Sequence, residues 1–308
     1  MPTPLLTAIV STYNAERFMR GCLDDLVAQS ALEAMQILVI DSGSQQGEGA
    51  ICQEYARQYP QIRLIRTERE PLYAAWNRAL AMASGKYLTS ANTDDRHCDR
   101  FVERMVKVLD DQAEVGLVYA DQYVSTTENE SFDACVSRDA SMLRWPAYTP
   151  EDLMLRCITG SQPVWRRSLH ETLGGFDVRY RIAADYDMWL RVAGKYELLH
   201  LAEPLGVFFS SPDTLSGASN HAQMYLESAE IQRARLAELP WRALPGMRKR
   251  LAAELFARGY RFLGDPAGQG ARAAASLIRE AIALDRWNAS FRKTYLLRCT
   301  LGIPMTRD

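Results

Sequence analysis

Two adjacent carboxylates, Asp94 and Asp95, are the residues of this 308-residue chain whose types most directly suggest chemistry. Neighbouring carboxylates repel each other unless water screens them or a cation lies between them. Hard divalent cations such as Mg²⁺ prefer oxygen ligands and often bridge to the phosphates of a substrate. The pair therefore indicates a metal site, and the alternative interpretation is a turn or a helix N-cap ahead of Phe101.

Two further carboxylates follow or begin predicted elements. Asp41 comes directly after an apolar run, where a carboxylate could accept hydrogen bonds from a ribose hydroxyl or a base N–H, or could simply begin a turn. Asp185 begins a short predicted helix that contains Trp189 and Leu190. There it could cap the unpaired backbone N–H groups, or it could act as a general base on an acceptor hydroxyl.

Strands and helices alternate around these residues over the first 121 positions. Strands are predicted over 5–10, 37–40, 62–65, 87–90 and 115–119, and helices over 18–27, 48–58, 72–84 and 101–109. This alternation predicts a parallel sheet covered on both faces. Ligands of such sheets bind beyond the carboxyl ends of the strands. Polar clusters follow the first four strands, at 11–16, 41–44, 67–70 and 92–95, so we expect them to meet at one edge.

The rest of the chain has a different pattern. Residues 122–150 are polar and predicted to be irregular, and a mixed region follows from about 151 to 217. Helices are predicted over 224–239, 247–263, 271–284 and 289–301, with breaks at proline and glycine. We therefore expect one domain over 1–217 and a helical extension over 218–308. Part of the extension weakly resembles one tetratricopeptide-type hairpin.

Composition excludes several classes of protein. Hydrophobic residues make up 47% and charged residues 24% of the chain, which is typical of globular proteins rather than disordered ones. No apolar run reaches the ~20 residues of a membrane-spanning helix, and the first residues lack the features of a secretory signal. The six cysteines form no Cys-x-x-Cys pair, so neither a zinc site nor a disulfide framework is expected. We expect a cytoplasmic protein.

Two nucleotide-binding signatures do not occur. The sequence has no Gly-x-Gly-x-x-Gly and no Gly-x-x-x-x-Gly-Lys-[Ser/Thr]. The sequence therefore lacks the main motifs that would indicate NAD-linked chemistry or P-loop phosphoryl transfer.

Short motifs in a fixed order resemble family 2 glycosyltransferases of the GT-A fold. The resemblance covers about residues 5–217. The motifs are Ser11-Thr12-Tyr13-Asn14, Ile40-Asp41-Ser42-Gly43-Ser44, Leu72-Tyr73-Ala74-Ala75-Trp76-Asn77, Ala83-Ser84-Gly85-Lys86-Tyr87, Asn92-Thr93-Asp94-Asp95, Thr159-Gly160-Ser161, Gly174-Gly175-Phe176-Asp177 and Asp185-Tyr186-Asp187-Met188-Trp189-Leu190-Arg191. The resemblance implies a GT-A fold, a Rossmann-like mixed α/β sheet covered by helices, here with a C-terminal helical extension.

The resemblance also implies a function. A sugar would be transferred with inversion from a nucleotide-diphosphate-sugar, by default a UDP-sugar, to an acceptor hydroxyl. The acceptor would be a glycan or a lipid-linked molecule in surface polysaccharide or glycan biosynthesis. Mg²⁺ or Mn²⁺ would be the cofactor.

The same resemblance assigns roles to individual residues. Thr12, Tyr13, Asn14 and Glu16 would line the nucleobase and ribose pocket, and Asp41 would hold the base or the ribose. Asn77 would lie near the ribose or phosphates of the donor. Asp94 and Asp95 would bind the metal, with Asn92 at the first position of the family's Asp-x-Asp motif and close to the donor. Asp185 would be the catalytic base.

Three positions depart from the family pattern. Asn92 replaces a carboxylate, Ala184 stands where many relatives carry Glu, and Ser211 stands where many carry His. Asn92 and Ala184 motivate an alternative, a catalytically inactive nucleotide-sugar-binding protein that uses its helical extension for interactions. Nucleotidyl transfer on a related fold lacks support, because no glycine-rich triphosphate loop follows the first strand.

Charge is distributed unevenly along the chain. Residues 241–308 contain 13 Lys and Arg against 5 Asp and Glu, a net charge of +8, which leaves −10 for residues 1–240. The basic segment predicts either a helical cap with solvated charges or a patch attracted to an anionic membrane or a phosphate-linked acceptor. The second interpretation would place the protein peripherally at the inner face of the membrane. Nucleic acid is not an expected partner, because aromatic residues are not interleaved with the basic ones.

Overall fold

The computed structural model describes residues 3–215, 217–238, 241–263 and 270–301. The chain forms two compact units. The first unit comprises residues 1–148, 158–184 and 191–211, and the second comprises 149–157, 185–190 and 212–308. The chain thus passes between the units several times, and the domain boundary expected at 217 stays a prediction.

A nine-stranded sheet forms the centre of the first unit among its described residues. The strand order is β3-β2-β1-β4-β8-β6-β9-β5, with β7 paired to β6. The bounds are β1 Leu6–Thr12, β2 Met35–Asp41, β3 Ile62–Arg66, β4 Tyr87–Ser90, β5 Arg96–His97, β6 Val115–Ser125, β7 Met142–Leu143, β8 Val164–Arg166 and β9 Glu197–Phe209.

The sheet is mixed. Strands β1 to β4 are parallel to one another, as the alternation of strands and helices predicts. Strand β8 runs antiparallel to both β4 and β6, and β5 runs antiparallel to β9. The mixed α/β sheet implied by the family resemblance is confirmed. The five strands predicted over the first 121 residues all run in one direction, because β8 is antiparallel to both β4 and β6 and so leaves β6 parallel to β4.

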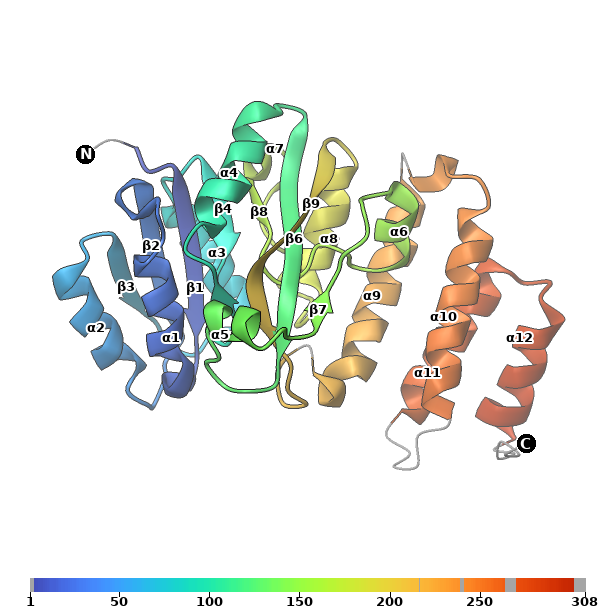
Figure 1. Cartoon of the computed structure of the whole chain (residues 1–308). Coiled ribbons are helices and arrows are strands. Elements are labelled where there is room, and N and C mark those ends of the chain that lie inside the picture. The colour runs from blue at the N-terminus through green and yellow to red at the C-terminus, as the bar shows by residue number, and fades with distance from the viewer. Residues whose placement is uncertain (1–2, 216, 239–240, 264–269, 302–308) are drawn as a thin grey trace. The chain divides into compact units, whose positions relative to one another are not determined.

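Helices cover both faces of the sheet (Figure 1). One face packs against α1 Glu16–Val27, α2 Glu48–Gln58 and α4 Phe101–Asp111, and α3 Leu72–Met82 packs against the other. Alternate residues of β1 explain the first contact, because Leu6, Ala8 and Val10 all point into the same buried cluster as the apolar side of α1. The predicted strands and helices of the first 119 residues are confirmed, with ends that differ by a few residues.

The stretch 122–150 is not irregular throughout, contrary to the sequence-based expectation. Strand β6 continues to Ser125, and α5 Phe132–Ser137 and β7 follow. The apolar pattern fades after Tyr119 because β6 buries polar residues there. Asp121 accepts a hydrogen bond from Trp145 N at 2.9 Å, and Gln122 donates to Ser161 Oγ at 3.0 Å. Helix α5 is short, and the side chain of Ser131 caps it.

The first unit also contains η1 Leu32–Ala34 and α7 Leu169–Leu173, and α8 Ala184–Ala193 has residues in both units. The second unit is mainly helical. Its elements are α6 Pro150–Leu155, η2 Ala218–Asn220, α9 His221–Leu236, η3 Trp241–Ala243, α10 Met247–Leu263, α11 Ala271–Leu284, α12 Ala289–Thr294 and a π-helical turn Tyr295–Thr300. Helices α10 and α11 approach closely at Gly259, where a Cβ would lie 2.9 Å from Ile278 Cγ1. The predicted C-terminal helices are confirmed.

In the part of the chain that the structure describes, no helix combines the length and apolar character needed to cross a membrane. All six cysteines are free thiols, and four of them are buried.

His97 is expected to make the stability of the first unit depend on pH. Its ring is buried against Phe101, with ring centroids 4.7 Å apart, and neither ring nitrogen has a hydrogen-bond partner among the described residues. Burial lowers the pKa of His97 to about 4. The unfolded chain therefore binds a proton that the folded chain does not, between about pH 6.5 and 4. This contribution to stability is complete above that window and is lost as the pH falls through it.

We expect the His97→Leu variant to have a smaller loss of unfolding free energy between pH 7 and pH 4.5 than wild type, by about 2–3 kcal/mol. Urea unfolding at both pH values measures the difference, and comparison of the two chains cancels the contribution of other titrating groups. Equal pH dependence in the two chains would show that His97 does not titrate in this way.

Candidate functional site

The carboxyl ends of β1, β2 and β3 lie side by side. The strand register pairs Thr12 with Asp41, and Asp41 with Arg66. The loops that follow are joined by hydrogen bonds, since Ser42 Oγ donates to Glu70 O at 2.8 Å and accepts from Glu70 N at 2.7 Å. Three of the four predicted polar clusters therefore meet at this edge of the first unit. The fourth, at 92–95, follows β4, which ends at the same edge because it runs parallel to β1.

Asp41 has one carboxylate oxygen that the described chain leaves without a hydrogen bond. The side chain is fully buried, and Oδ1 accepts from Ser44 N at 2.8 Å. Oδ2 lies 3.6 Å from Arg66 Nε, which is an ion pair without a hydrogen bond. The neighbouring Thr12 Oγ1 is likewise buried without a partner among the described residues. Buried polar atoms are normally hydrogen-bonded, so these two oxygens suit a polar ligand.

The loop after β1 presents an aromatic ring. Tyr13 is 40% exposed, and the Arg69 guanidinium lies 3.8 Å from the centre of its ring. Asn14 has a left-handed backbone with φ of 51°, and its Oδ1 accepts from Gln45 N at 2.9 Å. Glu16 Oε2 accepts from Gly47 N at 3.0 Å. Asn14 and Glu16 thus bind the loop after β2, whereas the Tyr13 ring is partly exposed and has the Arg69 guanidinium over one of its faces.

Arg69 is a candidate that sequence reasoning did not assign. Besides contacting Tyr13, its Nη1 donates to Ser42 Oγ at 3.2 Å. The polar cluster at 67–70 was the signal, but nothing in the sequence indicates which of its residues reaches the loops after β1 and β2.

Asp94 and Asp95 have different surroundings after β4. Asp95 is buried, and its Oδ1 accepts from Phe209 N at 3.0 Å while its Oδ2 accepts from Asn92 Nδ2 at 3.1 Å. Burial, and next the charge of Asp94, raise the pKa of Asp95 to about 7. Asp94 is half-buried, and burial also raises its pKa. Asp95 therefore ties this loop to β9, and Asp94 is the more accessible carboxylate.

The two carboxylates fit a hard divalent cation. Burial raises the pKa of both carboxyl groups, and the charge of Asp94 raises that of Asp95 further, so a cation beside them would favour their ionised forms. No group of three or more His, Cys, Asp or Glu side chains suited to a metal occurs among the described residues. A cation held by one or two carboxylates would take further ligands from substrate phosphates, as Mg²⁺ commonly does.

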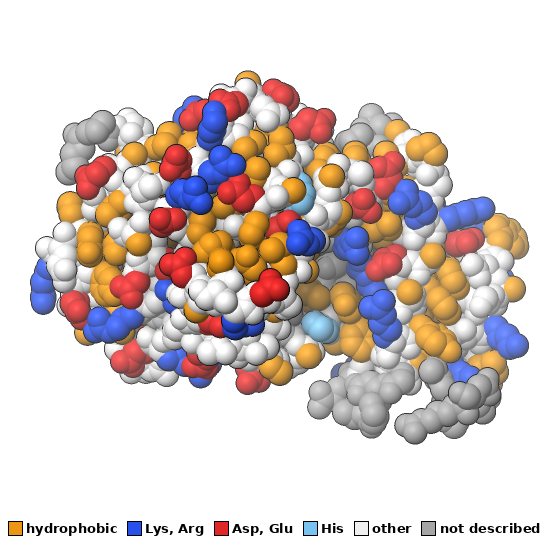
Figure 2. Space-filling model, viewed as in Figure 1, with side chains coloured by type: hydrophobic (Ala, Val, Ile, Leu, Met, Phe, Trp, Pro, Cys, Tyr) orange, Lys and Arg blue, Asp and Glu red, His pale blue; other side chains and the backbone are white. Residues whose placement is uncertain are grey.

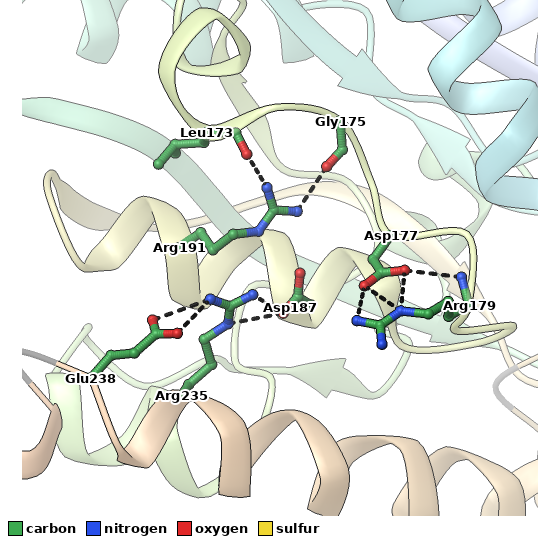
Figure 3. A network of polar contacts seen from close by, with 8 residues as sticks. All are labelled: Leu173, Gly175, Asp177, Arg179, Asp187, Arg191, Arg235 and Glu238. Carbon is green, nitrogen blue, oxygen red and sulfur yellow. Dashed lines mark hydrogen bonds and ion pairs between the residues drawn. The ribbon is translucent and has the colours of Figure 1, made fainter.

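Asn77 binds the backbone of a turn. Its Nδ2 donates to Phe176 O and its Oδ1 accepts from Phe176 N, both at 2.8 Å. Arg191 secures the same turn by donating to the carbonyl oxygens of Leu173 and Gly175 (Figure 3). The contact between Asn77 and a donor stays a prediction, and the contacts described here make Asn77 a residue that positions the turn.

Asp185 is the second residue of α8 and belongs to the second unit, whereas all the other predicted site residues belong to the first. Its side chain is half-buried, and Oδ1 accepts from Tyr186 N at 2.8 Å. The residues on either side, Ala184 and Tyr186, are buried.

Residues 7–158 match the family model described as glycosyl transferase family 2. The chain carries a family 2 glycosyltransferase domain. It is 33% identical over 126 residues to glycosyltransferase GlyA of Streptococcus pneumoniae serotype 4, a match that covers 41% of this chain and 18% of GlyA. It is 24% identical over 190 residues to chondroitin synthase of Escherichia coli, covering 62% of this chain and 26% of that protein. The chain thus spans well under half the length of these relatives.

Solved structures share the fold over nearly the whole chain. The structure of S. aureus TarS 1–349 in complex with UDP-GlcNAc has a TM-score of 0.69 at 14% identity and covers 98% of this chain and 93% of that one. Mannosyltransferase PcManGT from Pyrobaculum calidifontis, in complex with GDP-Man and Mn²⁺, has a TM-score of 0.63 at 20% identity, covering 97% and 85%. These similarities establish the GT-A type fold.

Proposed function

We propose that the protein transfers a sugar from a nucleotide-diphosphate-sugar, by default a UDP-sugar, to an acceptor hydroxyl with inversion. The observation that carries this proposal is the pair of buried oxygens without partners, Asp41 Oδ2 and Thr12 Oγ1, at the edge of the sheet where Asp94 also lies. These groups offer hydrogen-bond acceptors for a nucleoside and negative charge for a metal. The complexes of structural neighbours with UDP-GlcNAc and with GDP-Man and Mn²⁺ support the choice of ligand.

Each donor contact follows from the surroundings of the residue. Tyr13 would stack its exposed ring on the nucleobase, and Asp41 would accept a hydrogen bond from the base or the ribose. Asn14 and Glu16 hold the loop after β2 in place beside this pocket. Asp94 would hold Mg²⁺ or Mn²⁺. Asp95, which accepts a hydrogen bond from Phe209 N, would orient the loop after β4 that carries both carboxylates. The bound cation would neutralise charge on the leaving diphosphate.

Asp185 is the proposed general base. It would remove the proton of the acceptor hydroxyl while that oxygen attacks the anomeric carbon from the face opposite the nucleotide, and this single displacement inverts the configuration. The acceptor would be a glycan or a lipid-linked molecule in surface polysaccharide biosynthesis. Similarity to chondroitin synthase supports a role in polysaccharide assembly.

A donor panel tests this function directly. We expect UDP-sugars with Mn²⁺ to raise the melting temperature more than GDP- or dTDP-sugars, and the selected donor to release its nucleotide in the presence of a suitable acceptor. A chain that no nucleotide stabilises would contradict the proposal.

The alternative, a nucleotide-sugar-binding protein without transferase activity, rests on Asn92 and Ala184 in place of carboxylates found in relatives. The same panel separates the two. Stabilisation by a donor, with no nucleotide release across a range of acceptors, would favour the binding protein.

Contact with an anionic membrane is proposed for the second unit. Trp287, in the turn between α11 and α12, is 82% exposed, and Arg286, Arg292 and Lys293 close to it in sequence are also exposed. Figure 2 shows Lys and Arg side chains among hydrophobic and acidic ones over the C-terminal helices. An exposed tryptophan with cations nearby suits the headgroup region of a bilayer.

We expect the chain to sediment with vesicles that contain anionic lipid and to do so less at high salt. Trp287→Ala and Lys293→Ala should each weaken binding about fivefold, since one such contact contributes ~1 kcal/mol. Val178→Ala, which removes an exposed apolar side chain from the first unit, is the matched control. Equal sedimentation with neutral vesicles would exclude electrostatic attraction.

A further inference from the structure

The residues that follow Asp185 are held by side chains of α9, a helix far later in the sequence. Tyr186 and Asp187 come directly after Asp185 in α8, and Gln232 and Arg235 project from α9. All of these residues belong to the second unit. Their contacts therefore connect the helix turn that carries the proposed catalytic base to the helical extension.

Tyr186 is the first anchor. Its side chain is buried, and its hydroxyl donates to the carbonyl oxygens of Leu153 and Met154, at 2.8 and 3.0 Å. Gln232, also buried, donates from Nε2 to the Tyr186 hydroxyl oxygen at 3.1 Å and to Met154 O at 2.9 Å. Gln232 thus joins α8, α6 and α9 in one hydrogen-bonded group.

Asp187 is the second anchor. It is 3% exposed, and its Oδ1 accepts from Arg235 Nε at 3.0 Å and from Arg235 Nη2 at 2.8 Å. Arg235 Nη1 also contacts both carboxylate oxygens of Glu238, each at 3.1 Å, as Figure 3 shows. The guanidinium is therefore fixed by two carboxylates, and it donates to Asp187 through two nitrogens.

The two anchors together restrict how α8 can move. Consecutive helix residues project about 100° apart, so Tyr186 and Asp187 are held in different directions around the helix axis. A rotation or a shift of the first turn of α8 would break at least one of these groups of hydrogen bonds. Asp185 lies in that same turn, so its carboxylate is held with it.

We propose that Gln232 and Arg235 are positioning residues for Asp185, acting through Tyr186 and Asp187. This inference rests on the proposed function, in which Asp185 is the catalytic base. The helical extension thereby contributes to the chemical step, because a base displaced by about 1 Å can lose on the order of 10²-fold in rate.

The test uses the full chain, assayed for nucleotide release with Mn²⁺, the selected donor and acceptor. We expect Arg235→Ala to lower kcat by about 10- to 100-fold while the KM for the donor changes less than twofold. Arg235→Lys, which keeps the charge but loses the paired donors, should recover part of kcat. Gln232→Leu should lower kcat with the same unchanged donor KM.

Arg233→Ala is the matched control. Arg233 lies on the same helix, its side chain is 61% exposed, and its ion pair with Glu280 is long, at 3.9 Å, so kcat should stay at the wild-type value. Melting temperatures of all variants show whether each is folded. Arg235→Ala removes the two hydrogen bonds that Arg235 donates to the buried Asp187 carboxylate, which can prevent folding. If the Arg235→Ala chain does not fold, kcat of Gln232→Leu is used to test the inference.

Wild-type kcat in a folded Gln232→Leu chain and in a folded Arg235→Ala or Arg235→Lys chain would overturn the inference. A fall in kcat matched by an equal rise in donor KM would do the same, because it indicates a general structural defect. Asp185→Asn, measured alongside, separates this outcome from failure of the proposed function. If that variant keeps full activity, Asp185 is not the base, whatever the α9 variants do.

Discussion

Asp185→Asn is expected to lower kcat for sugar transfer by about 10²–10⁴-fold, the usual contribution of a general base. The amide has the same size as the carboxylate but does not accept the proton of the acceptor hydroxyl. Its oxygen can still accept the hydrogen bond from Tyr186 N, so the melting temperature should change little. The affinity for the nucleotide should also be unchanged, because the residues proposed to bind it belong to the other unit. Nucleotide release with Mn²⁺ and acceptor measures the loss.

Asp111→Asn is a suitable control for that experiment. Asp111 is an exposed carboxylate at the end of α4, paired with Lys107 one helical turn away, so its replacement should leave kcat unchanged. Turnover of Asp185→Asn at the level of this control would exclude Asp185 as the base.

Asp94→Asn is expected to lose activity, whereas Asp95→Asn is expected to lose stability. Asp94→Asn should lower kcat/KM by about 10²–10³-fold and raise the Mn²⁺ concentration needed for half-maximal activity, because it removes the accessible metal ligand. Its melting temperature should be unchanged or higher, since burial disfavours the Asp94 charge and that charge disfavours ionisation of Asp95.

Asp95→Asn should instead lose stability. The amide has one acceptor oxygen in place of two, so it does not satisfy both Phe209 N and Asn92 Nδ2. A buried donor left unpaired costs about 1–3 kcal/mol, which thermal unfolding would detect. Melting curves with and without UDP and Mn²⁺ compare the two variants. Loss of the Mn²⁺ response in Asp95→Asn alone would reverse the roles assigned to the two carboxylates.

Local periodicity was sufficient to predict most elements of the first unit. Strands such as β1 and helices such as α4 are long enough for an apolar pattern to repeat, and both were predicted close to their observed bounds. Strand β8 has only three residues, Val164–Arg166, and α5 has six, so each element is too short for its apolar pattern to repeat recognisably. The antiparallel pairing of β8 with β4 and β6 depends on distant partners and was not predicted.

The candidate site was predictable as a location but not as a set of contacts. Because parallel strands end at a common edge, the polar clusters after β1, β2 and β3 could be placed together. The partners of individual side chains could not. Asn77 binds Phe176, 99 residues away, and Arg235 binds Asp187, 48 residues away, and such contacts leave no local pattern in the sequence.

The way the chain passes between its two units determines how it can be recombined with its relatives. Residues 149–157 and 185–190 are grouped with the helices after Ser211, although they are encoded between segments of the sheet. A chimaera that exchanged only the C-terminal helices for those of a relative would join foreign side chains to the native Tyr186 and Asp187. Transplanting this extension therefore requires the two inserted segments to be exchanged with it.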